Sequence, residues 1–159
     1  MVAGESGTVS TVKEKEARYQ AALRQAVEQA LAPYGSEAAV IEETVQDTPG
    51  LWCLDVRPTA ERAAPASITY LGGGDEIVLG FGHTHMYMWD DDHLDLAREV
   101  RDLLEAAFAA NFVEAGPHQD AFSRISTRSG MKGVGKMHLP WPWRLRRTRT
   151  YAPYGARPS

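Results

Sequence analysis

The chain has 159 residues, 43% of them apolar and 24% charged, which is the composition of an ordinary globular domain with room for one hydrophobic core. Its single cysteine, Cys53, excludes an internal disulfide and a cysteine-based zinc cluster. The first residues lack the basic start and apolar run of a signal peptide, and no apolar stretch approaches the roughly 20 residues that span a bilayer. We therefore expect a cytoplasmic protein that makes no membrane contact.

Charge is divided unevenly along the chain. Residues 1–120 hold all 21 Asp and Glu against 8 Lys and Arg, a balance of −13, whereas residues 121–159 hold 9 basic residues and no acid. An acidic body repels nucleic acid and attracts basic partners. The basic end could bind phosphate or fold back on the acidic body, and we expect the second.

The first predicted element is a helix over residues 11–35. Its apolar positions recur at spacings of three and four and form one stripe: Tyr19, Leu23, Ala26, Val27, Ala30 and Leu31. Thr11 and Glu14 fit a capping box at its start, and Pro33 and Gly35 end it. A helix with a single stripe requires a surface to pack on, and a sheet is the natural one.

Four short segments rich in β-branched and aromatic residues follow the helix. They cover residues 38–46, 51–57, 67–71 and 76–81. Two of the intervening segments, 47–50 and 72–75, have the glycine, proline and aspartate content of tight turns. Short turns between successive strands predict an antiparallel meander.

A second helix is predicted over residues 92–116. Its expected buried side consists of Leu94, Ala97, Val100, Leu104, Ala107, Phe108 and Asn111, and Gly116 with Pro117 would end it. Residues 120–139 then resemble a further hairpin that turns at Ser129–Gly130.

This order of elements predicts an α+β fold, with two long helices packed on one antiparallel sheet of about five to seven strands. Residues 1–139 are expected to form a single domain. Residues 140–159 show no helical or strand period, and we expect a basic aromatic tail that is extended or partly disordered. The tail interleaves arginine with tryptophan and tyrosine, as single-strand nucleic-acid contacts do, but the acidic body makes a nucleic-acid partner unlikely.

The stretch "GFGHTHMYMWDDDH", residues 80–93, is the most distinctive chemistry in the chain. If a strand continues through 83–89, its period of two places His83, His85, Tyr87 and Trp89 on one face. Two imidazoles spaced in this way can share a zinc ion, with a third ligand from Asp91 or from its neighbours Asp90, Asp92 and His93. A zinc-dependent hydrolase would also need a base such as Glu76 or Glu37 near the bound water.

The same residues have an explanation without metal. Asp90, Asp91 and Asp92 stand where the second helix begins, where carboxylates cap free N–H groups and interact with the helix dipole. The segment resembles the "HTHP" start of JAMM-type zinc metalloproteases, but Met86 stands where proline is usual. His93 and Leu96 hold the places of the serine and the aspartate that this family requires farther on, and Asp95 is out of register. We therefore expect no cofactor, with zinc held by His83, His85 and Asp91 as the alternative.

The stretch is most similar to a segment of small immunity proteins from bacterial polymorphic toxin systems. In those proteins a glycine-rich strand with a His-x-His-aromatic sequence leads through acidic residues into an amphipathic helix. The corresponding residues here are Gly80, Gly82, His83, His85, Tyr87, Trp89 and Asp90 to Asp92, within a resemblance that spans about residues 67–116. The resemblance implies a non-enzymatic cytoplasmic protein that neutralises a cognate toxin by binding it.

Our prediction is therefore a binding protein whose partner is a protein toxin, of basic charge if the acidic body guides the encounter. The expected binding surface consists of His83, His85, Tyr87, Trp89, Asp90, Asp91, Asp92 and His93. The zinc hydrolase, and a homodimer formed through the aromatic face, are the alternatives.

Overall fold

The computed structural model describes residues 6–46, 50–72, 76–89, 93–116, 121–135 and 147–155, and all structural statements below refer to them. The chain begins with helix α1 (Ser6–Leu31) and the short 3-10 helix η1 (Ala32–Tyr34). The strands of the first sheet are β1 (Ala39–Gln46), β2 (Leu51–Pro58), β3 (Ala66–Leu71), β4 (Glu76–Phe81) and β5 (Thr84–Trp89). Helix α2 (His93–Phe108), β6 (Phe112–Ala115), β7 (Phe122–Thr127), β8 (Gly130–Val134) and β9 (Thr148–Arg149) follow.

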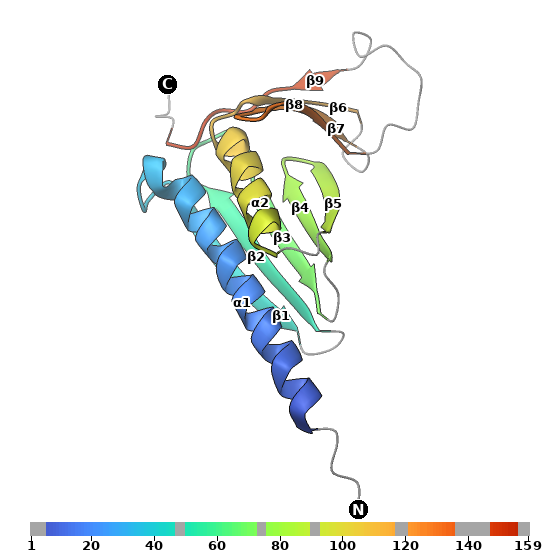
Figure 1. The fold of residues 1–159 in the computed structure, drawn as a ribbon. Helices are drawn as coiled ribbons and strands as arrows, with labels where there is room; N and C mark the ends of the chain where they lie inside the picture. The colour runs from blue at the N-terminus through green and yellow to red at the C-terminus, as the bar shows by residue number, and fades with distance from the viewer. Residues whose placement is uncertain are drawn as a thin grey trace, which may run out of the picture.

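The first five strands form an antiparallel sheet in the order β1-β2-β3-β4-β5, which confirms the predicted meander. Both helices lie against the same face of this sheet (Figure 1). Alternate residues of each central strand point into that layer, among them Trp52, Leu54, Ile68, Ile77 and Leu79, all at most 1% exposed. The opposite face of the sheet carries no helix among the described residues.

Helix α1 buries the predicted stripe, since every residue from Tyr19 to Leu31 that was assigned to it is at most 9% exposed. The predicted capping box is wrong. The helix begins at Ser6, so Thr11 already has helical neighbours on both sides and cannot act as the first capping residue. The predicted end is correct to within a few residues, because Pro33 lies in η1 and Gly35 has a φ of 85°.

The second helix is shorter than predicted. Helix α2 ends at Phe108, and the residues expected to form its last turns make strand β6 instead. Ala110 has a φ of 58°, the N–H of Asn111 donates to the carbonyl of Ala106, and the N–H of Ala110 donates to that of Ala107. This pair of bonds is a Schellman motif, which turns the chain out of the helix. The sequence did not indicate this helix end, because the left-handed position is occupied by alanine and not by the usual glycine.

Strands β6 to β9 form a second antiparallel sheet in the order β8-β7-β6-β9. The α+β class is confirmed, but the single sheet of five to seven strands is replaced by sheets of five and four strands. The predicted hairpin is present as β7 and β8, and its turn is Arg128–Ser129, because Thr127 pairs with Gly130. The two sheets share one core, in which the rings of Phe81 and Phe112 meet edge to face at 5.1 Å.

The packing does not end at the expected boundary near residue 139. Thr148 and Arg149 pair with β6, and Tyr154 is only 2% exposed. The Tyr154 ring stacks on Phe108 at 4.2 Å, and its hydroxyl donates to the carbonyl of Ala64 at 2.7 Å. Residues 147–155 therefore belong to the fold, while the rest of the expected tail lies outside the described residues. The sequence did not predict this packing, because the aromatic residues of this segment recur with neither a helical nor a strand period.

Within the described part of the chain, no helix combines the length and the apolar composition needed to cross a bilayer.

Candidate functional site

A tight turn interrupts the segment that was expected to be one continuous strand through residues 83–89. Phe81 at the end of β4 pairs with Thr84 at the start of β5, so Gly82 and His83 form a two-residue hairpin loop. Gly82 has a φ of 60°, as the first loop position of a type II′ turn requires. His83 therefore lies in the turn, and the expected alignment of His83 with His85 on one strand is wrong.

From Thr84 onward, successive side chains alternate between the two faces of the sheet. His85, Tyr87 and Trp89 are exposed, whereas Thr84 and Met88 are buried on the opposite face of the sheet. Tyr87 is 55% and Trp89 is 73% exposed, which is unusual for two large aromatic side chains that lie two positions apart on one strand. These three residues form the border of the uncovered face of the first sheet.

The predicted surface also includes the four residues that follow β5 in the sequence. Asp90, Asp91 and Asp92 lie outside the described residues, and only the backbone of His93 is described, as the first residue of α2. Among described residues no three His, Cys, Asp or Glu side chains gather as metal ligands would. The zinc alternative thus remains a prediction that depends on these aspartates.

The uncovered face of the β1–β5 sheet, called the open face below, extends the surface beyond β5. Residues that pair directly across antiparallel strands share a face, so the register assigns its members. The apolar members are Val40, Leu51, Cys53, Leu71, Val78, Tyr87 and Trp89, and the charged ones are Glu42, Asp55, Arg57 and Glu76. Three carboxylates against one guanidinium make the described open face acidic, and Arg57 is already paired with Glu42 at 2.8 Å.

Beneath the β4–β5 turn lies a buried carboxylate that the sequence did not single out. Glu114 of β6 has no exposed surface. Its Oε1 accepts from the backbone N–H of His83 at 2.7 Å and from the hydroxyl of Thr84 at 2.8 Å. Its Oε2 accepts from Arg149 Nε at 2.9 Å and from the hydroxyl of Tyr151 at 2.6 Å. Burial alone would raise the pKa of Glu114, but the four hydrogen bonds outweigh it and hold this pKa below its usual range.

The surroundings of Glu114 are closed by further contacts. Thr84 uses its proton toward Glu114, so the hydroxyl of Ser123 is the donor in the bond between Ser123 and Thr84. A side chain on Gly82 would place its Cβ only 2.7 Å from the Tyr151 hydroxyl. Since each carboxylate oxygen of Glu114 already accepts two bonds, this network joins the β4–β5 turn to the second sheet, and no substrate group can reach the carboxylate. Its only sequence signal is a glutamate inside the apolar run of β6.

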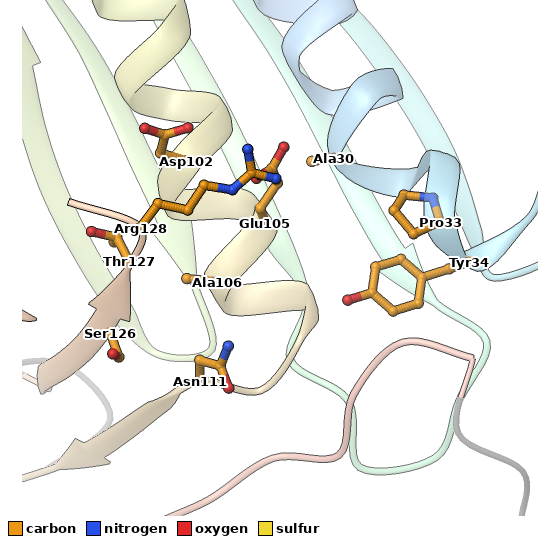
Figure 2. A pocket seen from close by; sticks show the side chains of 10 residues that line it. All are labelled: Ala30, Pro33, Tyr34, Asp102, Glu105, Ala106, Asn111, Ser126, Thr127 and Arg128. Atoms are coloured by element: carbon orange, nitrogen blue, oxygen red, sulfur yellow. The ribbon is translucent and has the colours of Figure 1, made fainter. Parts of the chain in front are cut away.

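A separate hollow of about 430 Å³ lies between the ends of α1 and α2 and the β7–β8 turn. Figure 2 shows Tyr34 on one wall and Arg128 reaching over the other toward Glu105. Glu105 is paired with Arg128 at 2.9 Å and lies 3.6 Å from Arg101, which also approaches Asp102 at 3.7 Å. Burial, and then the charge of Glu105, raise the pKa of Tyr34. The charged groups of this hollow are engaged with one another rather than directed at a ligand.

Comparison with protein-family models, with curated proteins and with solved structures finds no match to this chain.

Proposed function

We propose that this chain is a non-enzymatic binding protein that recognises a partner protein through the open face of its five-stranded sheet. The observation that carries the proposal is the exposure of Tyr87 and Trp89, at 55% and 73%, on a sheet face that no described helix covers. Aromatic side chains of this kind supply most of the binding energy in protein interfaces.

The two exposed aromatic side chains of the open face have an apolar neighbour. Tyr87 lies two positions from Trp89 on β5 and pairs with the half-buried Val78 of β4, so these three side chains form one apolar group. Single exposed apolar residues are common on any protein surface, but a continuous exposed apolar patch marks an interaction site. The carboxylates that border this patch favour a partner with a basic surface.

The immunity-protein resemblance gives the proposal its specific form, in which the partner is a basic bacterial toxin that this protein neutralises by occlusion. Of the described residues that carry that resemblance, His85, Tyr87 and Trp89 lie on the open face, whereas Gly82 and His83 form the β4–β5 turn. Immunity genes stand beside toxin genes, so the products of neighbouring genes are the partners to test.

The experiment compares two variants for binding to those gene products by calorimetry. In the variant Tyr87→Ser/Trp89→Ser, loss of both anchors should weaken binding by on the order of 30-fold or more. Met131→Ser is the matched control, because Met131 is 64% exposed but lies on β8 in the other sheet. Its binding should be unchanged, and co-expression of the wild-type chain should protect cells from the toxin.

Three results would contradict the proposal. They are the absence of binding to any neighbouring gene product, equal binding by the Tyr87→Ser/Trp89→Ser variant, and a homodimer in solution that this variant dissociates. Light scattering on the free protein distinguishes the last case.

A further inference from the structure

One row of residues crosses the open face from strand to strand. Asp55 pairs with Ser67, Ser67 with Gly80, and Gly80 with His85, so all four lie side by side on the same face. These four residues are among those that line a hollow of about 220 Å³. Its polar lining consists of Asp55, Arg57, Ser67 and His85.

The glycine is needed for the space and not for the backbone. The φ of Gly80 lies outside the left-handed region, so any residue can adopt its backbone conformation. A Cβ at this position would lie 2.7 Å from Ser67 Oγ and 3.4 Å from His85 Nε2. The hydroxyl and the imidazole, whose Cδ2 would be 3.1 Å from that Cβ, therefore already lie over Gly80 and leave no room for a methyl group there.

The polar groups around the hollow have unused hydrogen-bonding capacity. Asp55 accepts only from the thiol of Cys53, at a sulfur-oxygen distance of 3.8 Å, although a carboxylate has about four acceptor positions. Within the described residues, neither the hydroxyl of Ser67 nor the imidazole of His85 makes a hydrogen bond. The neighbouring Arg57 differs, because Glu42 already neutralises it.

We propose that this hollow receives a basic side chain, an arginine, from the partner protein, an inference that rests on the function proposed above. The Asp55 carboxylate accepts from the guanidinium, Ser67 Oγ offers a second acceptor, and the imidazole of His85 provides a flat wall for the planar cation. Tyr87 and Trp89, next along β5, would then surround this charged contact with apolar surface.

The first test uses N-acetyl-arginine amide as the probe and N-acetyl-citrulline amide as its neutral isostere, with amide chemical shifts recorded by NMR. The arginine probe should produce saturable shifts at residues 55, 67, 80 and 85, with a dissociation constant on the order of millimolar. The citrulline probe should bind at least about fivefold more weakly. Equal shifts from both probes, or no saturable shift from the arginine probe, would overturn the proposal.

Two variants locate the contact. Asp55→Asn keeps the shape and removes the charge, and it should weaken arginine binding by about fivefold or more. Gly80→Ala places a methyl group against Ser67 Oγ and the His85 ring and should weaken binding, because both of these side chains line the hollow and must move. Glu76→Gln, on the same face but outside the hollow, is the control and should bind as the wild type does. If Gly80→Ala lowers the melting temperature, its loss of binding could come from disturbed folding, and the effect of Asp55→Asn on arginine binding then decides the test.

The same variants separate this inference from the proposed function. If Tyr87→Ser/Trp89→Ser weakens binding of the partner protein and Asp55→Asn leaves it unchanged, the arginine site is refuted and the binding role stands. If the arginine probe binds as expected but no neighbouring gene product binds, the proposed function is refuted and the arginine site stands.

Discussion

Glu114 is a carboxylate enclosed by protein that keeps its charge because each of its oxygens accepts two hydrogen bonds. The donors come from the β4–β5 turn and from the C-terminal segment that contains Arg149 and Tyr151. Arg149 also donates from Nη1 to the carbonyl of Gly116 at 2.8 Å. One side chain thus holds together three separate parts of the chain.

Replacing Glu114 with Gln should destabilise the protein by about 3 kcal/mol, because the Arg149 guanidinium loses its buried counter-charge and the new amide N–H groups face donors. Urea unfolding measures this difference. Glu99→Gln is the control, since the Glu99–Lys132 pair is largely exposed and its loss should change the free energy of unfolding by no more than about 1 kcal/mol. Equal effects from the two variants would contradict the role of the buried network.

The lowered pKa of Glu114 also predicts a dependence of stability on pH. A group whose pKa is lower in the folded protein stabilises the fold above its unfolded-state pKa, about 4.3 for glutamate, and this stabilisation is lost as pH falls through the folded-state value. The free energy of unfolding of the wild type should therefore decrease below about pH 4, and that of Glu114→Gln should decrease less steeply. An equal decrease of the free energy of unfolding with falling pH in the two proteins would contradict this expectation.

At the scale of single elements, the end of α2 decides how the second sheet begins. The Schellman motif at Ala110 stops the helix and directs Asn111 toward β7, where its carbonyl accepts from the N–H of Ser126 at 2.8 Å. Strand β6 then starts at Phe112 and carries Glu114 into the core. Without this turn the residues of β6 would extend the helix and the second sheet would lose a central strand.

Ala110→Gly should stabilise the protein by about 0.5 to 1 kcal/mol, since glycine removes the strain of a φ of 58°, and part of the gain is offset by the greater entropy of the unfolded chain. Ala109→Gly is the matched control, because Ala109 has no positive φ and should lose stability on the same change. Thermal unfolding of the two variants would give shifts of opposite sign. A loss of stability in Ala110→Gly would contradict the assigned geometry.

At the scale of the whole molecule, residues 147–155 close the structure over the end of α2. Tyr151 stacks on Phe112 at 4.9 Å, Tyr154 stacks on Phe108, and the N–H of Tyr154 donates to the carbonyl of Phe108 at 2.8 Å. Ala152 in turn donates from its N–H to the carbonyl of Arg62 at 2.9 Å. The segment thereby joins the loop before β3, the end of α2 and the second sheet.

Tyr154→Ala should destabilise the protein by about 3 kcal/mol or more through loss of a buried ring, and Tyr154→Phe by about 1 kcal/mol through loss of the bond to Ala64. Tyr87→Phe removes an exposed hydroxyl and should change the free energy of unfolding by less than about 0.5 kcal/mol. Denaturant titration measures all three variants. Unchanged stability in Tyr154→Ala would show that the segment is not part of the cooperative unit.

Some features of this protein follow from the sequence because they depend only on neighbouring residues. The β-branched and aromatic residues between turn segments predicted strands β1 to β4 nearly to their ends, and the stripe from Tyr19 to Leu31 predicted the buried face of α1. A period of two separated His85, Tyr87 and Trp89 from the buried residues of β5. The period alone determines on which face of a helix or strand a side chain lies, because that face depends on the residue's place in the local repeat.

Other features depend on residues that are distant in sequence, and only the tertiary structure decided them. The Glu114 carboxylate is satisfied by donors as far away as Tyr151, 37 positions along the chain, and no local pattern announces them. The hollow over Gly80 exists because the register aligns four strands, and a slip of one residue would move its lining to the helix side. Local periodicity therefore determined which residues face outward, whereas long-range pairing determined what those residues can form together.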